Sequence, residues 1–139
     1  MTREMKYPDT KYFKYHNENY KNRIGGDCVI RAISLSTGKG WVQTIRELTE
    51  VGIKLGYVCN DDKTFIKYLL ENGFEQCKEP RDEFNRKLTA KEFIDSIDFK
   101  YKTIVAMVGS HHLVCIKDNK VYDIWDCSKN TMHRYWVLK

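Results

Sequence analysis

The spacing of apolar residues changes once along this chain of 139 residues, and that change limits the folds open to it. In the first two-thirds, apolar side chains recur every three or four positions, which is typical of helices that pack by one face. From residue 103 they alternate with a period of two, which is typical of strands. Helices followed by strands predict an α+β fold, with N-terminal helices packed on a C-terminal antiparallel sheet.

The helical pattern divides into four segments, at residues 28–37, 41–55, 61–72 and 88–97. Gly38 and Gly73 follow the first and third segments, where helix ends favour glycine. In the last segment Thr89 and Glu92 have the spacing of a capping box, in which each satisfies a backbone N–H of the helix start.

The strand pattern also divides into four runs, at residues 103–109, 112–118, 120–126 and 132–138. Turn-forming residues separate the second run from the third and the third from the fourth, which predicts an antiparallel meander. A tight hairpin between the second and third runs would pair residues whose numbers sum to about 237.

The excess of positive charge is concentrated near the N-terminus. Lys and Arg total 24 against 19 Asp and Glu, a net charge of +5. Residues 1–23 alternate Lys and Tyr with polar residues, so we treat them as a basic, aromatic-rich arm ahead of a single domain at 24–139. Lysines and aromatic rings suit phosphates and bases, but no nucleic-acid recognition motif accompanies them. An arm that wraps the domain is the favoured interpretation, and nucleic acid stays open as a partner.

Compartment and redox state follow from what the sequence lacks. No apolar run approaches the roughly 20 residues of a membrane-spanning helix, and the N-terminus has no apolar signal region. We therefore expect a cytoplasmic protein without a membrane partner. The five cysteines are an odd number without a CxxC pair, which predicts free thiols rather than a disulfide framework.

One of these thiols lies at a helix start. The stretch "GGDCVIRAIS" places Cys28 directly after a Gly/Asp turn, at the first position of a predicted helix. Unpaired N–H groups and the positive end of the helix dipole favour a thiolate there, which makes a cysteine nucleophilic. The alternative is a small apolar residue packed in the first turn.

A nucleophilic thiol needs a base, and two of the four histidines, His111 and His112, begin a predicted strand. Neighbours in a strand point to opposite faces, so only one of them can share a face with a given partner. The hairpin register brings His112 toward Asp126, with Asp123 as the alternative. Cys28 as nucleophile, His112 as base and Asp126 as the acid that orients the ring would form a catalytic triad.

These motifs, in this order, resemble the papain-like cysteine peptidases, and most of all their compact bacterial and phage forms such as the bacteriocin-processing double-glycine peptidases. That group carries Asp-Cys at a helix start, then H-x-V-V and Asp-Pro on consecutive strands. This chain has Asp27-Cys28, then "HLVC" from His112, then Asp126 followed by Cys127. The resemblance implies a papain-like fold with Cys28 as nucleophile, His112 as base and Asp126 as orienting acid.

The resemblance spans roughly residues 20–128 and also bears on the oxyanion. The N–H of Cys28 is one candidate donor, and a side-chain amide upstream is a second. The family uses a glutamine about six positions before the cysteine, and here that position holds Asn22, one methylene shorter.

Taken together, the residues predict a cysteine hydrolase that cleaves an amide in a peptide or protein substrate through a thioester, without a cofactor. Acyl transfer to an amine would use the same thioester. The alternative is an inactive papain-like binding protein, such as a phage- or mobile-element-encoded inhibitor of a host protein or nucleoprotein. Asn22 and the basic arm keep that alternative open.

Metal binding and a second reactive thiol are the remaining alternatives. Cys28, His111, His112 and Cys127 are of zinc-binding types, but their spacing matches no finger or HExxH pattern, so we expect no metal. Cys127 is the alternative reactive thiol, and the other three cysteines are expected to be structural: Cys59, Cys77 and Cys115.

Overall fold

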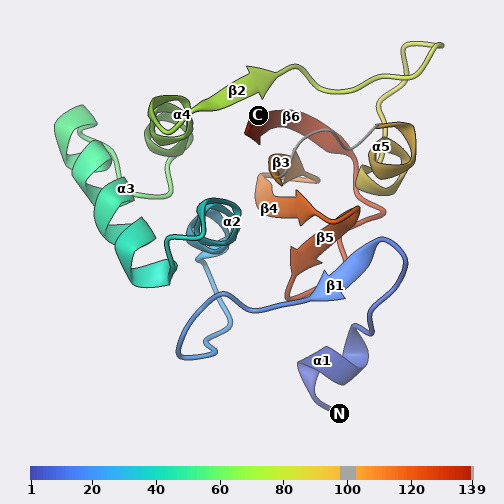
Figure 1. The fold of residues 1–139 in the computed structure, drawn as a ribbon, viewed down its shortest axis with the longest axis horizontal. Helices are drawn as coiled ribbons and strands as arrows, with labels where there is room; N and C mark the ends of the chain where they lie inside the picture. Colours follow the sequence, from blue (N-terminus) through green and yellow to red (C-terminus); the bar gives the residue numbers. More distant parts are fainter. Residues whose placement is uncertain (98–102, 139) are drawn as a thin grey trace.

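The computed structural model describes residues 1–97 and 103–138, and its architecture is α+β (Figure 1). A six-stranded mixed sheet has the order β1-β5-β4-β3-β6-β2. The strands of this sheet are β1 (Phe13–Tyr15), β2 (Phe74–Cys77), β3 (Thr103–Val108), β4 (His112–Lys117), β5 (Lys120–Asp123) and β6 (Met132–Leu138). The helices in the described ranges are α1 (Arg3–Lys6), α2 (Cys28–Thr37), α3 (Trp41–Leu55), α4 (Asp62–Glu71) and α5 (Ala90–Ser96).

The four predicted helices are confirmed to within two residues at each end, because local capping fixes them. Helix α2 ends at Gly38, whose φ of 74° is the left-handed conformation that glycine adopts without strain. Helix α4 begins after Asp61, whose side chain accepts a hydrogen bond from the Lys63 N–H. Helix α5 begins with the complete capping box of Thr89 and Glu92.

Both faces of the sheet are covered. Helices α2, α3 and α4 lie on one side and α5 on the other (Figure 1). Alternate residues of β3 point into two separate cores: Val105 packs with α2 to α4, whereas Ile104 packs with α5. The prediction that helices pack on the sheet is thus confirmed. The predicted helices lie on both faces of the sheet, because α5 covers the face opposite α2 to α4.

The predicted meander is right for three strands and wrong for the fourth. Strands β3, β4 and β5 form it, and the predicted hairpin register is confirmed because Cys115 pairs with Tyr122. Strand β6 instead crosses over and pairs with β3, because the outer edge of β5 is occupied by β1. Strand β1 pairs parallel to β5, with Phe13 opposite Val121, so the sheet is mixed rather than antiparallel.

The N-terminal arm, residues 1–23, contributes to the sheet and the core. Phe13 in β1 has no exposed surface, and the Nε of Arg3 donates to the carbonyl oxygen of Ile124 at 2.7 Å. The arm therefore holds the edge of β5 and the segment that follows it.

Two further predictions concern the cysteines and a membrane-spanning helix. All five cysteines are free thiols, as expected. Within the described ranges, no helix has the length and apolar character needed to cross a bilayer.

Candidate active site

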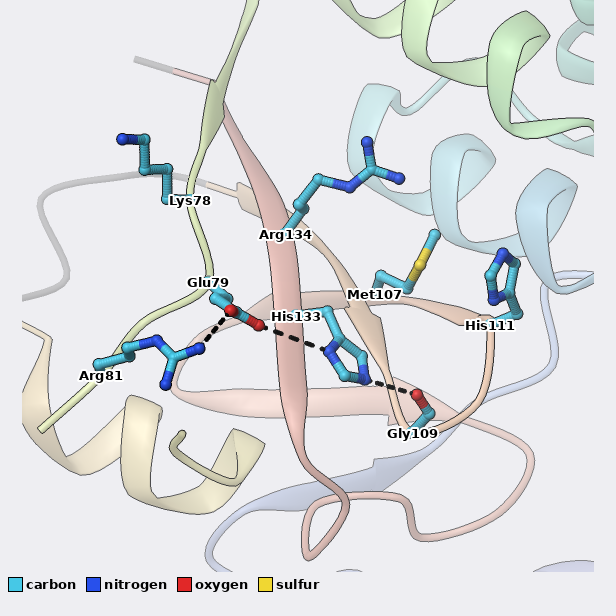
Figure 2. A pocket seen from close by; sticks show the side chains of 8 residues that line it. All are labelled: Lys78, Glu79, Arg81, Met107, Gly109, His111, His133 and Arg134. Carbon is cyan, nitrogen blue, oxygen red and sulfur yellow. Dashed lines mark hydrogen bonds and ion pairs between the residues drawn. The ribbon is translucent and has the colours of Figure 1, made fainter. Parts of the chain in front are cut away.

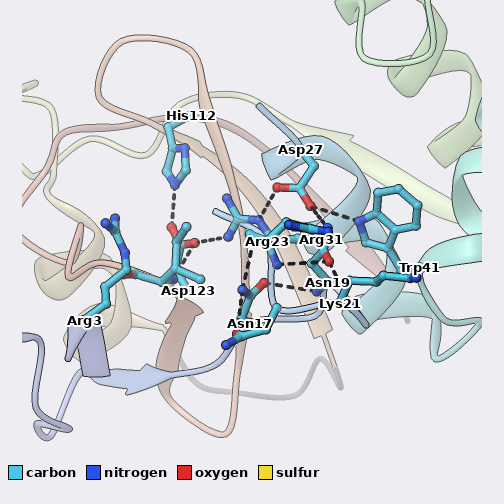
Figure 3. A network of polar contacts seen from close by, with 12 residues as sticks. Arg3, Asn17, Asn19, Lys21, Arg23, Asp27, Arg31, Trp41, His112 and Asp123 are labelled. Carbon is cyan, nitrogen blue, oxygen red and sulfur yellow. Dashed lines mark hydrogen bonds and ion pairs between the residues drawn. The ribbon is translucent and has the colours of Figure 1, made fainter. Parts of the chain in front are cut away.

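The site begins at the turn that leads into α2. Asp27 caps this helix, but its carboxylate bonds to partners outside the first turn's N–H groups. It accepts hydrogen bonds from Asn19 Nδ2 at 3.0 Å, from Trp41 Nε1 at 2.9 Å and from Arg31 Nε at 2.9 Å (Figure 3). The preceding loop, α2 and α3 thereby hold the turn in place, and the turn fixes the position of Cys28 at the start of α2.

Cys28 is half-buried, and its sulfur hydrogen-bonds to residues at the start of β4. Burial raises the pKa of the Cys28 thiol, but a hydrogen bond to the His112 ring and one from the Leu113 backbone N–H outweigh it, and the pKa lies below its ordinary value. The N-terminus of α2 acts in the same direction. The sulfur is therefore in an environment that favours the thiolate.

The imidazole of His112 lies between this thiol and an acid. Its Nε2 hydrogen-bonds to Asp123 Oδ2 (Figure 3). The same ring makes a hydrogen bond to Cys28, for which Nδ1 is the remaining ring nitrogen. The Trp125 ring covers the imidazole, with centroids 5.0 Å apart. Burial lowers the pKa of His112, but hydrogen bonds to Asp123, Cys127 and Cys28 raise it well above its usual value. The two opposite shifts both favour a thiolate–imidazolium pair over a neutral thiol and a neutral imidazole.

Asp123 completes the chain of contacts because of where it lies in β5. The β4–β5 register, continued by one residue, places Asp123 opposite Val114 and diagonal to His112. Its other oxygen, Oδ1, accepts from Arg31 Nη1 at 2.5 Å, and both side chains are buried. Burial raises the pKa of Asp123, but the imidazole and the guanidinium outweigh it and hold the pKa below its ordinary value.

The expectation that Asp126 orients His112 is corrected. Its carboxylate accepts from the backbone N–H of Ser128 at 3.0 Å and from the Ser128 hydroxyl at 2.6 Å. Strand β5 ends at Asp123, and the Ile124 N–H donates back to the Asp123 carboxylate at 2.8 Å. The chain has left the sheet before Asp126, so Asp126 serves the turn.

Of the two adjacent histidines, His112 is the one brought to Cys28. His111 lies in the turn before β4 with a positive φ of 67°, and its side chain is 75% exposed. Its Nε2 is 3.3 Å from Asp62 Oδ2, at the start of α4. The turn conformation of His111, rather than alternation within a strand, thus separates the pair.

Asn22 lies on the exposed loop before α2. Its backbone is left-handed, with φ of 55°, and its side-chain oxygen accepts a hydrogen bond from Asn17 Nδ2 at 3.1 Å. An oxyanion role for Asn22 stays a prediction. The Cys28 N–H, in the first turn of α2, belongs to the backbone groups that have no acceptor within the helix.

Sequence reasoning missed Arg31. Its guanidinium joins Asp27 before the helix to Asp123 on the sheet, and only 8% of its side chain is exposed. Two signals were present: an Asp–Arg pair four residues apart, and a single charged residue within an otherwise uncharged helix.

The second thiol near His112 belongs to Cys127, which is fully buried. Its Sγ lies 3.8 Å from Asp123 Oδ2, and donor atoms of His112, Asp123 and Cys127 lie within 4.8 Å of one another. These are metal-ligand types, but the Arg31 cation on Asp123 opposes a metal dication there. The geometry suits proton transfer between hydrogen-bonded groups better than metal coordination.

Comparisons of the chain with protein-family models, with curated proteins and with solved structures give no match. The inference of function therefore depends on the geometry of Cys28, His112 and Asp123.

Proposed function

We propose that this protein is a cysteine hydrolase of papain-like fold that cleaves an amide bond in a peptide or protein through a thioester at Cys28. The observation that carries the proposal is the continuous set of contacts from Cys28 to His112 to Asp123. A nucleophile, a base and a group that orients the base are what covalent acyl transfer requires.

The proposed reaction has two halves. The Cys28 thiolate attacks the carbonyl carbon, and the N–H at the start of α2 is placed to donate to the oxyanion. Imidazolium His112 protonates the leaving amine as the C–N bond breaks, which leaves an acyl thioester. Neutral His112 then removes a proton from water, the resulting hydroxide attacks the thioester, and the carboxylic acid and thiolate are released.

Asp123 and Arg31 act as positioning residues in this scheme. The carboxylate holds the imidazole ring through Nε2 and stabilises its positive charge. The guanidinium keeps that carboxylate ionised, and it ties α2, which carries the nucleophile, to β5. A single buried ion pair thus supports the spacing between thiol and base.

One observation favours a second candidate, an inactive papain-like binding protein that targets a host protein or nucleoprotein. Asn22, the predicted oxyanion donor, lies on an exposed loop with its side-chain oxygen bonded to Asn17, and no hydrogen bond among the described residues joins it to Cys28 or His112. Loss of one oxyanion donor typically costs about 100- to 1,000-fold in turnover, so such a scaffold would serve binding better than catalysis.

The first test is the reactivity of Cys28 itself. Iodoacetamide is added to folded and urea-unfolded protein at pH 6, and each cysteine is followed by mass spectrometry. We expect Cys28 to react at least about tenfold faster in the folded protein, because the fold lowers the pKa of its thiol. Cys59 and Cys77, which are also half-buried, are internal controls. Equal rates for Cys28 in both states would reject an activated nucleophile.

The second test separates enzyme from binder. p-Nitrophenyl acetate reports thioester formation as a burst of nitrophenolate, and continued release reports hydrolysis. The proposal predicts a burst of one equivalent followed by turnover, and neither in Cys28→Ala. A burst without turnover supports the binding protein, because deacylation would then have been lost.

A further inference from the structure

A second cavity lies beside the candidate active site. It has a volume of about 620 Å³ and opens between the segment after β2, the end of β3 and the start of β6 (Figure 2). The space around Cys28 and Asp123 measures only about 10 Å³. The larger cavity thus has room for the side chains of a substrate.

The ionisable groups of this cavity are mostly basic. Lys78, Arg81 and Arg134 line it together with His111 and His133, against one acid, Glu79. That acid is already satisfied by its own neighbours. Its carboxylate accepts from Arg81 at 2.6 Å, with Lys87 Nζ at 3.4 Å and His133 Nδ1 at 3.8 Å.

Lys78 and Arg134 therefore give the cavity its net positive charge. Arg134 is 41% exposed, and its nearest acid is Asp62 at 3.7 Å, which also lies 3.3 Å from His111. The distance between Arg134 and Asp62 is longer than a hydrogen bond, so N–H donors of the guanidinium stay free for a ligand. Among the described residues, no acidic side chain pairs with Lys78.

The cavity adjoins the nucleophile through two short connections. Met107 lines it and pairs across the β3–β4 ladder with Leu113, whose N–H bonds to the Cys28 sulfur. His111, on its rim, directly precedes His112. The cavity and the nucleophile are thus joined through neighbouring residues of β3 and β4.

We infer that this cavity is the specificity subsite of the proposed hydrolase and that it takes acidic side chains of a peptide substrate. A guanidinium matches a carboxylate in a two-point hydrogen bond, which suits Arg134 for Asp or Glu. Met107 supplies apolar surface for the side-chain stem. The inference rests on the proposed function, since it assigns to this cavity the part of the peptide substrate next to the cleaved bond.

Binding tests the subsite without any chemistry. Cys28→Ala protein is titrated into fluorescein-labelled hexapeptides of alternating Gly and Glu, or of Gly and Lys, and anisotropy is read. We expect the Glu peptide to bind at least about tenfold tighter, and Arg134→Gln to weaken it about fivefold. Lys54→Gln, which removes one exposed charge from α3 away from the cavity, is the matched control and should change binding less than about twofold.

Equal weakening by Arg134→Gln and Lys54→Gln would overturn the inference, because net charge alone would then explain it. So would displacement of the Glu peptide by a hexaribonucleotide at lower concentration than by unlabelled Glu peptide, which would assign the cavity to nucleic acid.

Acyloxymethyl ketone versions of the two peptides separate this inference from the proposed function. In the wild-type protein we expect Cys28 to be alkylated at least about tenfold faster by the Glu peptide. Equal alkylation by both peptides would overturn the subsite and leave the nucleophile standing. Selective binding without alkylation by either would support the subsite and reject the hydrolase.

Discussion

Two thiols contact one imidazole in this molecule, and their environments differ in nearly every respect. Cys28 is half-buried at the start of α2, whereas Cys127 is fully buried behind the ring in the turn after β5. The pKa of Cys28 lies below its ordinary value, and burial raises the pKa of Cys127 to about 11. Proximity to a histidine therefore does not by itself make a thiol nucleophilic.

The difference comes from the remaining neighbours. Cys127 faces the carboxylate of Asp123 at 3.8 Å, and that negative charge opposes a thiolate. Cys28 instead receives an N–H from Leu113 and lies at a helix N-terminus. Cys127 is thus suited to donate a hydrogen bond to Asp123, and Cys28 to attack a substrate.

Removal of the shared imidazole should have the largest effect. His112→Gln leaves Cys28 without its cationic partner, so its pKa rises toward that of a free thiol. A thiol with a pKa near 8.5 is only about 0.3% thiolate at pH 6, so we expect alkylation of Cys28 to slow by about 100-fold there. Iodoacetamide kinetics at pH 6 measure this. An unchanged rate would mean that the helix start alone activates Cys28, and the comparison with Cys127 would fail.

The sequence predicts well what local chemistry decides. The helix boundaries of α2 and α5 follow from Gly38 and from the Thr89–Glu92 capping box, which act within one turn. The β4–β5 hairpin follows from its two-residue turn. These features needed no knowledge of the remaining chain.

Features set by distant segments could not be predicted in this way. Strands β1 and β2 have only three and four residues, too few for a period to be recognised, and each is fixed by a partner far along the chain. The choice of Asp123 over Asp126 depends on where β5 leaves the sheet, which β1 and Arg31 help to determine. The hairpin register by itself leaves both acids open as partners of His112.

Replacement of Asp123, compared with replacement of Asp126, should give the next largest effect. Asp123→Asn removes the anion that stabilises imidazolium His112, so the pKa of His112 falls and that of Cys28 rises. Since a thiolate is lost as the pH drops through its pKa, alkylation of Cys28 will fall off at higher pH in this variant. We expect rates at pH 6 about tenfold lower. The rate–pH profile measures the shift.

Asp126→Asn is the matched control, because it removes the same charge three residues away, at a carboxylate that accepts its hydrogen bonds from Ser128. Its profile should match that of the wild-type protein. A larger shift for Asp126→Asn than for Asp123→Asn would restore Asp126 as the orienting acid.

The smallest effect is expected at Cys127. Cys127→Ala removes a hydrogen bond to Asp123 and some packing, so we expect about 1 kcal/mol less stability in urea unfolding, and Cys28 alkylation no more than about twofold slower at pH 6. Cys127→Ser keeps a donor of similar size and should keep the wild-type alkylation rate. If Cys127→Ala instead abolished the fast alkylation, the thiol measured would be the buried one, and the roles assigned to the two cysteines would have to be exchanged.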